Sequence, residues 1–359
     1  MGDDALLDLI ALQCEGVRAQ LEEAGRRGGA GPADGKAFLF GGHPVMIPTL
    51  NRPAQRSAFT IASGGEGLLE LRKADQVLGT LTAVPRPRFY DLCTADGIPY
   101  ERIARLHGAD CVASTVVQQC IRYDDPRTRC RFCAIGVSLA RGATIRTKTP
   151  AQLAEVALAA RRLDGVTHVT LTSGTTRAPD RGAAYLGECA CAIKQASGLP
   201  VQAQFEPPED VATFAALKEL GVDDVGLHVE SFDERVRERM TPGKAEITVE
   251  AYFRAFEAAV RVFGRGKVST YVILGLGEDE AITLEGCRRA AELGVYPFVV
   301  PLRPLMDTFL AKAIPPPADY MQRMYGAVGA MLRRYALSSD TSSAGCVKCG
   351  ACSLLKLGQ

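Results

Sequence analysis

Two groups of three cysteines are the residues of this chain best suited to bind a metal ion or an iron–sulfur cluster. In the first group, nine residues separate Cys120 from Cys130 and two separate Cys130 from Cys133. The short interval lets one turn present two thiolates, and the long arm brings Cys120 back to them. Three thiolates hold a [4Fe–4S] cluster with one iron open to an external ligand, whereas structural zinc needs four protein ligands. A zinc loop, or cysteines that only pack in the core, is the alternative interpretation.

The second group lies near the end of the sequence, where two residues separate Cys346 from Cys349 and two more separate Cys349 from Cys352. This spacing opens a bacterial ferredoxin cluster run, and its small neighbours make core packing a poor explanation. We therefore expect a second [4Fe–4S] cluster, with zinc completed by a fourth Cys or His as the alternative. The sequence leaves the fourth ligand open between a substrate, a non-cysteine group and one of Cys14, Cys93 and Cys111.

The segments around the first group alternate between apolar β-type runs and helical stretches. Six such units with right-handed crossovers predict the α/β class and a partial (β/α)6 barrel of the TIM type. In such barrels the chemistry lies at the C-terminal ends of the strands. The expected strands are 114–118, 166–171, 201–205, 225–229, 268–274 and 296–300, and the expected helices are 150–163, 183–197, 212–220, 248–263 and 281–293.

The remaining segments flank this barrel. A mixed 3 and 4 spacing of apolar residues predicts a helix over 5–24 that ends at Gly25, followed by a loop to residue 35. Short β-prone runs at 37–40, 45–47, 58–62 and 68–71 then indicate a small β-rich unit. We expect an N-terminal α+β region over 1–108, the barrel over 109–335 and a C-terminal cysteine-rich segment over 336–359.

The amino-acid composition limits the kinds of partner that this protein is expected to bind. The 359 residues include 42 Lys+Arg and 41 Asp+Glu, for a net charge of +1, without blocks of basic residues. This balance gives no electrostatic reason to expect nucleic acid or an anionic membrane, so a small-molecule substrate is expected. We see no basic leader segment and no run of roughly 18 apolar residues, which favours a cytoplasmic protein. Because thiols stay reduced there, ligation explains the 12 cysteines better than disulfides.

Polar residues follow several of the expected strands and are candidates for binding a ligand. Ser173, Gly174 and Thr175 come after the second strand. His228 and Glu230 on the fourth strand are two residues apart and therefore face the same side. The third strand ends at Glu206, for which a solvated carboxylate is the alternative interpretation.

Taken together, residues 111–305 resemble the radical S-adenosylmethionine (SAM) superfamily, in which biotin synthase and lipoyl synthase are the nearest understood relatives. The resemblance implies that Cys120, Cys130 and Cys133 hold a [4Fe–4S] cluster whose open iron SAM chelates. The chain departs from the usual C-x3-C-x2-C motif in its nine-residue first interval. The implied SAM contacts are Phe132 and the segment of Gly275 and Leu276 at the adenine, Ser173, Gly174 and Thr175 at the methionyl amino group, His228 and Glu230 at the ribose, Arg254 at the carboxylate, and Glu206.

The resemblance also implies an activity. A reduced cluster would cleave SAM to methionine and a 5′-deoxyadenosyl radical, which abstracts hydrogen from the substrate. An external one-electron donor such as flavodoxin or ferredoxin is implied as a partner. The whole chain looks like a radical SAM branch found beside nitrilases in bacterial gene clusters. It lacks the N-terminal auxiliary cysteine motif of lipoyl synthase, so lipoate and biotin chemistry are not carried over.

Several alternatives stay open. The second cluster would donate sulfur, accept an electron from a substrate radical or anchor the substrate. Two other classes of protein would also use two cysteine groups, namely an electron-transfer protein with two clusters and no SAM, and a zinc-stabilised binding protein. The polar residues at the strand ends argue against a simple electron carrier, which needs none of them.

Overall fold

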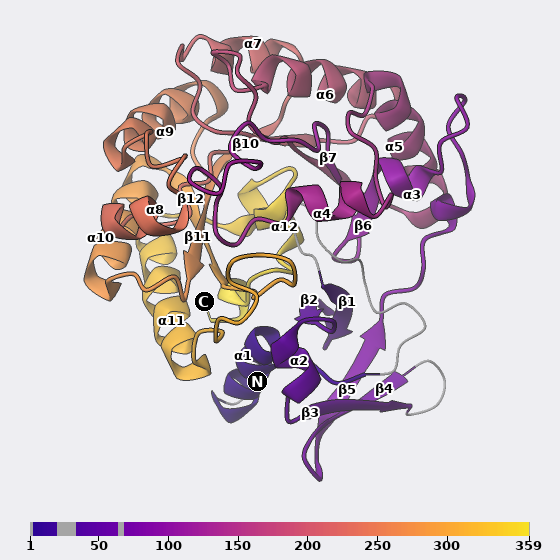
Figure 1. Ribbon diagram of the computed structural model, residues 1–359, viewed down its shortest axis with the longest axis vertical. Helices are drawn as coiled ribbons and strands as arrows, with labels where there is room; N and C mark the ends of the chain where they lie inside the picture. Colours follow the sequence, from indigo (N-terminus) through magenta and orange to yellow (C-terminus); the bar gives the residue numbers. More distant parts are fainter. Residues whose placement is uncertain (1–2, 20–33, 64–67, 359) are drawn as a thin grey trace.

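The larger of two β-sheets forms an open half-barrel (Figure 1). The computed structural model describes residues 3–19, 34–63 and 68–358. Six parallel strands follow the order of the chain, and a short antiparallel strand, β6, extends the sheet beside β7. The strands are β6 (Arg105–His107), β7 (Cys111–Thr115), β8 (His168–Thr172), β9 (Val201–Gln204), β10 (Asp224–Gly226), β11 (Val268–Leu274) and β12 (Val295–Pro301).

Helices cover the outer face of this sheet, as Figure 1 shows. The crossover helix α5 is defined at both ends, because Thr149 and Gln152 form a capping box and Gly165 ends the helix. The parallel sheet and the helices outside it confirm the expected α/β partial barrel. The helices of this layer are α5 (Pro150–Asp164), α6 (Ala183–Ser197), α7 (Thr213–Glu219), α9 (Val249–Phe263), α10 (Glu280–Leu293) and α11 (Ala318–Arg334). Two short helices, α4 (Ile135–Ala140) and α8 (Glu234–Met240), lie next to the loop between β7 and α5.

Two of the expected strands end differently in the structure. The first begins at Cys111, and residues 116–118 leave the sheet to pair with the segment 146–148. The fourth ends at Gly226, because the Val229 N–H donates to the Thr270 hydroxyl and not to a backbone carbonyl. Strand β6 and helix α11 were not predicted. After each of these two strands, the backbone leaves the ladder of hydrogen bonds and lies next to the barrel interior.

The second sheet is antiparallel and lies beside the half-barrel in Figure 1. Its order is β2-β1-β5-β4-β3, and the β5 strand was not predicted. The helix expected over 5–24 is shorter, because the chain turns after Glu15 and Val17 and Arg18 bond to strands of this sheet. Residues 20–33 of the expected helix and loop lie outside the described residues. The elements are α1 (Asp3–Glu15), β1 (Gly35–Phe40), β2 (His43–Pro48), α2 (Arg52–Arg56), β3 (Phe59–Ser63), β4 (Leu68–Lys73) and β5 (Gln76–Ala83).

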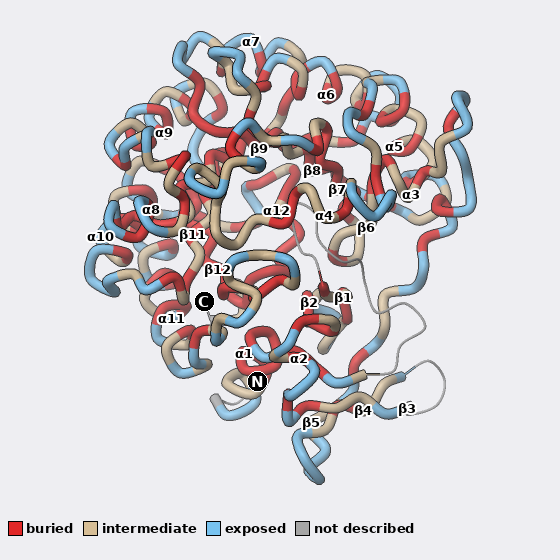
Figure 2. The backbone as a smooth tube through the Cα atoms, viewed as in Figure 1, coloured by how far each residue is buried: buried red, intermediate tan, exposed pale blue. Residues whose placement is uncertain are grey.

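One hydrophobic core joins the two sheets. It runs from Leu9 on α1 through the barrel strands to Leu355, and α1 packs against α11. Figure 2 shows buried residues along the barrel strands and exposed residues on the outer turns of the helices. No helix among the described residues is long and apolar enough to span a membrane.

The C-terminal segment, residues 338–358, runs inside the half-barrel (yellow in Figure 1). The backbone N–H groups of Ser343 and Ala344 donate to the buried carboxylate of Asp224 at 3.1 Å, at the start of β10. Further along, the Met46 N–H donates to the Ala351 carbonyl at 2.7 Å, which ties the segment to β2. The segment carries η2 (Ser339–Thr341), the single helical turn α12 (Cys346–Cys349) and η3 (Leu355–Gly358). It therefore fills the barrel interior from the amino ends of the strands.

The anchor at Asp224 predicts a pH dependence of stability. Burial raises the pKa of Asp224 to about 7, against the opposing effects of Lys267 and the two N–H donors. This pKa lies above that of an unfolded aspartate, so the stabilisation is complete below about pH 4 and is lost as the pH rises through about 7. We expect the unfolding free energy to fall by about 2–3 kcal/mol from pH 5 to pH 8, relative to Asp224→Asn. Urea unfolding of both proteins across this range measures it, and a constant difference would contradict it.

Candidate functional site

One cavity of about 700 Å³ lies at the carboxyl ends of the parallel strands and reaches down to the C-terminal segment. Both cysteine groups line it, so thiols that are more than 200 residues apart in the chain face one space. The polar strand-end residues surround the same space. The expected site residues that line the cavity are Cys120, Cys130, Cys133, Phe132, Ser173, Gly174, Thr175, Glu206, His228, Glu230, Cys346, Cys349 and Cys352.

The first cysteine group lies on a loop that folds back on itself. The nine-residue interval forms turns in which the Thr128 and Arg129 N–H groups donate to the Asp125 carbonyl. The Arg131 N–H then donates to the Met240 carbonyl at 2.8 Å, which fixes the loop against the end of α8. The Cys133 N–H donates to the Cys130 carbonyl at 3.1 Å, so these two thiols share one turn. The long first interval is therefore compatible with three thiols at one place.

The next strand end packs tightly against this loop. The Gly174 N–H donates to the Val117 carbonyl at 2.9 Å, and the Ile121 N–H donates to the Thr175 carbonyl at 3.0 Å. A Cβ on Gly174 would collide with the backbone carbonyl of Gln119. Glycine is required at this position because the two loops touch through their backbones.

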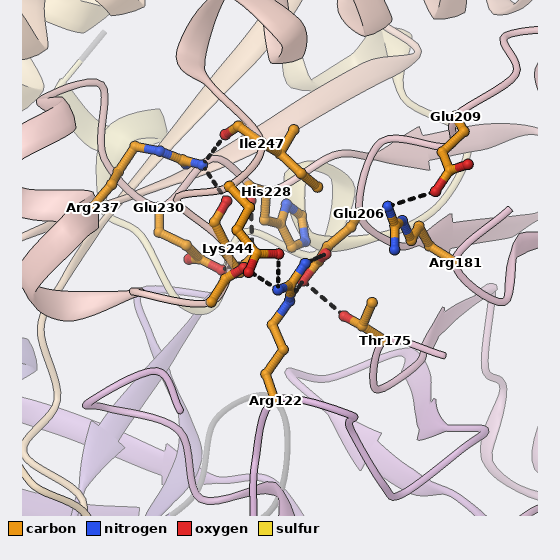
Figure 3. A network of polar contacts seen from close by, with 12 residues as sticks. Arg122, Thr175, Arg181, Glu206, Glu209, His228, Glu230, Arg237, Lys244 and Ile247 are labelled. Atoms are coloured by element: carbon orange, nitrogen blue, oxygen red, sulfur yellow. Dashed lines mark hydrogen bonds and ion pairs between the residues drawn. The ribbon is translucent and has the colours of Figure 1, made fainter. Parts of the chain in front are cut away.

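A buried ion pair joins the cysteine loop to β9 (Figure 3). Arg122 donates to both carboxylate oxygens of Glu206, at 3.3 and 3.0 Å, and the two side chains are 7% and 6% exposed. Thr175 donates to the same carboxylate at 2.7 Å. Arg122 also donates to the Gly243 carbonyl and to the exposed carboxylate of Glu246. Burial opposes the charge of Glu206, but the nearby Lys244, together with Arg122 and Thr175, holds its pKa below the usual value and keeps it ionised.

A second buried pair lies beside it. Lys244 donates to the Glu230 carboxylate at 2.9 Å and to the His228 carbonyl at 3.1 Å (Figure 3). Burial works against the lysine charge, yet the neighbouring carboxylates raise its pKa well above the ordinary value. Glu230 has a backbone φ of 67°, in the left-handed region that an L-residue adopts only under constraint. Such strain is typical of functional sites.

His228 lines the cavity, and its ring carries a hydrogen-bond donor at a fixed position. Its Nδ1 atom accepts from the Tyr271 N–H at 3.2 Å, so the neutral ring carries its proton on Nε2. Burial and the nearby Lys244 lower the pKa of His228 to about 3, which keeps the ring neutral. The buried Nε2 atom has no hydrogen-bond partner among the described residues. A ligand acceptor in the cavity would satisfy this donor.

The second cysteine group begins in the single turn of α12. Cys346 and Cys349 are three residues apart on this turn and so lie on the same side of it. Gln204 donates to the Cys346 sulfur at 3.1 Å, and the Tyr271 hydroxyl also bonds to it. Tyr271 in turn packs edge-on against His228, with 4.6 Å between ring centroids. The two ends of the cavity are therefore linked through adjacent side chains.

Burial raises the pKa of five of these thiols and keeps them protonated at neutral pH without a metal, namely Cys130, Cys133, Cys346, Cys349 and Cys352. Burial raises the pKa of Cys133 to about 11 and that of Cys352 to about 12, and neighbouring thiols contribute in the same direction. Binding of iron or zinc would release these protons, because the thiolate is the ligand. In the described part of the chain, no group of three or more His, Cys, Asp or Glu is arranged to hold a metal ion. Each group nevertheless faces the cavity with soft sulfur donors, the set that iron–sulfur clusters use.

Three expected site residues do not line the cavity. The expectation for Arg254 was wrong, because its side chain lies on the exposed side of α9 while Phe253 beside it is buried. Gly275 and Leu276 lie just past the cavity, where their N–H groups donate to the Glu278 carboxylate at 2.8 Å. Leu276 belongs to a small apolar cluster against which Phe132 packs.

The structure also brings residues to the cavity that the sequence analysis missed. Arg122 follows Cys120 by two positions, and this proximity to an expected cluster ligand was an available signal. Lys244 and Tyr271 belong to no sequence motif, and their positions at the cavity depend on the packing of α8, β10 and β11. His107 on β6 lies against the second cysteine group.

Comparison with known proteins relates the chain to one superfamily. A family model described as the Radical SAM superfamily matches residues 124–296. The bacteriochlorophyllide c C-7(1)-hydroxylase of Chlorobaculum limnaeum is 30% identical over 125 residues, which are 34% of this chain and 31% of the hydroxylase. The chain thus matches about a third of the length of this relative.

Two solved structures are also similar. HydG, a maturase of the [FeFe]-hydrogenase, has a TM-score of 0.48 at 17% identity, over 67% of this chain and 53% of HydG. Methylornithine synthase, PylB, has a TM-score of 0.47 at 16% identity, over 63% of this chain and 62% of PylB.

The buried ion pair predicts an unequal response to substitution. Arg122→Met should lower the unfolding free energy by about 3–5 kcal/mol, because it leaves the Glu206 carboxylate buried without its main partner. Glu246→Gln is the matched control, since its carboxylate binds the same arginine but is 71% exposed, and it should cost below about 1 kcal/mol. Urea unfolding of each variant measures these costs. Equal losses in the two variants would contradict the prediction.

Proposed function

We propose, from the premise that this chain carries a radical SAM domain over residues 124–296, that it is an enzyme acting on a small molecule by radical chemistry. The observation that supports this most directly is the cavity shared by the cysteine loop and the polar residues at the strand ends. When bound by Cys120, Cys130 and Cys133, a reduced [4Fe–4S] cluster would supply the electron that cleaves SAM and releases the hydrogen-abstracting 5′-deoxyadenosyl radical.

The neighbouring residues are proposed to bind and orient SAM. The His228 Nε2–H and the Glu230 carboxylate would bind the ribose hydroxyls, since one donates and the other accepts. Phe132 would contact the adenine, and the backbone of Ser173, Gly174 and Thr175 would meet the methionyl amino group. Gly275 and Leu276 would support the adenine from behind the apolar cluster, without lining the cavity.

The buried ion pairs are proposed to act as positioning groups. Glu206 already accepts from Arg122 and Thr175, so it would hold the cysteine loop in place as well as facing SAM. Burial raises the pKa of Cys130, and the nearby Lys244 opposes this shift, so Lys244 would help to stabilise the thiolate that binds iron.

We propose that Cys346, Cys349 and Cys352 hold a second, auxiliary [4Fe–4S] cluster. The support for this is that all three line the other end of the cavity, where Cys349 and Cys352 are buried and Cys346 is half-buried. A two-cluster electron carrier is the alternative, but it leaves the unpartnered donor of His228 and the strained Glu230 without a role. A zinc-stabilised binding protein is the second alternative, and the absence of colour near 400 nm would distinguish it.

The flanking regions are proposed to enclose the radical. We retain 1–108, 109–335 and 336–359 as the N-terminal region, the barrel and the auxiliary cluster segment. The N-terminal region contributes Met46 and Tyr90 to the cavity wall, and the last segment contributes its cysteines. An external one-electron donor such as flavodoxin or ferredoxin would reduce the first cluster.

Substitution of one cysteine in each group separates the two proposed clusters. Anaerobic reconstitution should load about 8 iron atoms per chain, and either Cys130→Ala or Cys349→Ala should lower this to about 4. Cys130→Ala should abolish formation of 5′-deoxyadenosine with dithionite, whereas Cys349→Ala should retain it. Iron analysis and chromatography of the nucleoside measure these results. Loss of cleavage in Cys349→Ala alone would reverse the assignment.

The donor on His228 predicts a specific loss of SAM affinity. His228→Phe keeps an aromatic ring beside Tyr271 but removes the Nε2–H, and the dissociation constant for SAM should rise about tenfold. His228→Gln retains an N–H donor and should lose less. Equilibrium dialysis of the reconstituted protein with labelled SAM measures both. Unchanged affinity in His228→Phe would remove His228 from the SAM site.

A further inference from the structure

His107 lies between two thiols of the second cysteine group. Its Nδ1 atom is 3.2 Å from the Cys349 sulfur, and its Nε2 atom is 3.4 Å from the Cys352 sulfur. The imidazole and all three thiols of the group line the same cavity. Imidazole nitrogen is an established iron ligand in proteins, including in iron–sulfur clusters.

The backbone around His107 is shaped to bring it this close. Strand β6 ends at His107, and Gly108 follows with a φ of 63°. A Cβ on Gly108 would lie 2.5 Å from the Cys349 sulfur, which is too close for any other residue. The edge strand is thus pressed against α12, and the position of His107 is fixed by its pairing with Cys111 on β7.

The three cysteines left as candidates for the fourth ligand are less well placed. Cys93 is exposed, and Cys14 is buried on α1, where Arg303 and Glu15 are the charged groups that act on it. Cys111 is near the group, but its sulfur contacts the Thr170 hydroxyl at 3.4 Å. None of the three lines the cavity, whereas His107 does.

We propose that His107 is the fourth protein ligand of the auxiliary cluster, an inference that rests on the proposed binding of that cluster by Cys346, Cys349 and Cys352. With four protein ligands, no iron of this cluster stays open, so anchoring of substrate on the cluster is excluded. A neutral imidazole in place of a thiolate also makes the cluster less negative, which favours its reduction. Of the three roles considered, electron acceptance fits this ligand set best.

The test isolates the auxiliary cluster within the full-length chain. A parent variant with Cys120, Cys130 and Cys133 replaced by Ala is reconstituted with iron and sulfide, reduced, and studied by pulsed EPR. We expect about 4 iron atoms per chain and a directly bound nitrogen coupling that changes on ¹⁵N-histidine labelling. The chain has only 4 histidines, which simplifies the assignment. His107→Ala should abolish the coupling, and His107→Cys should keep the iron without it.

Two matched controls complete the design. Cys111→Ala and His43→Ala, the latter at an exposed histidine, should both retain the nitrogen coupling. A parent variant that loads about 4 iron without histidine coupling, or a coupling that survives His107→Ala, would overturn the ligand proposal while leaving the second cluster intact. A coupling lost in Cys111→Ala and kept in His107→Ala would do the same. A parent that binds no iron would refute the auxiliary cluster itself, and His107 with it.

Discussion

The buried ion pair between Arg122 and Glu206 is the interaction on which the geometry of the site depends. Each charge would cost several kcal/mol to bury alone, so the two side chains must stay together. Arg122 belongs to the loop that carries Cys120, and Glu206 follows β9, so their pairing fixes the loop over the half-barrel. The Thr175 hydroxyl also donates to the Glu206 carboxylate, so the segment after β8 is held to the same ion pair.

Charge balance then constrains the rest of the cavity. Lys244 is buried next to Glu230 and near Glu206, so the carboxylates compensate a cation that burial alone would neutralise. The same cation lies close to Cys130 and makes the thiolate state easier to reach. The strained backbone of Glu230 is maintained because its carboxylate is bound to Lys244 and its N–H donates to the Tyr271 carbonyl. The same charged side chains therefore stabilise the fold and line the cavity.

The sequence predicted those parts of the site that depend on local spacing. Cys130 and Cys133 share one turn and Cys346 and Cys349 another, so each pair follows from its interval alone. The barrel strands followed from runs of buried apolar residues, which the parallel sheet needs on both faces. The prediction for Arg254 was wrong because adjacent side chains on a helix point about 100° apart, so a shift of one residue moves a side chain from the core to solvent.

Contacts between distant segments could not be predicted in this way. His107 and Cys349 are 242 positions apart and meet only because the C-terminal segment enters the half-barrel. That entry depends on a buried carboxylate at Asp224 and on backbone amides that find partners inside the barrel. The α12 turn thus belongs at once to the core of the fold and to the wall of the cavity. A metal cluster bound there would stabilise the native chain over the unfolded one, because the unfolded chain has no preformed site. Folding and cluster binding are in this way coupled through one short segment.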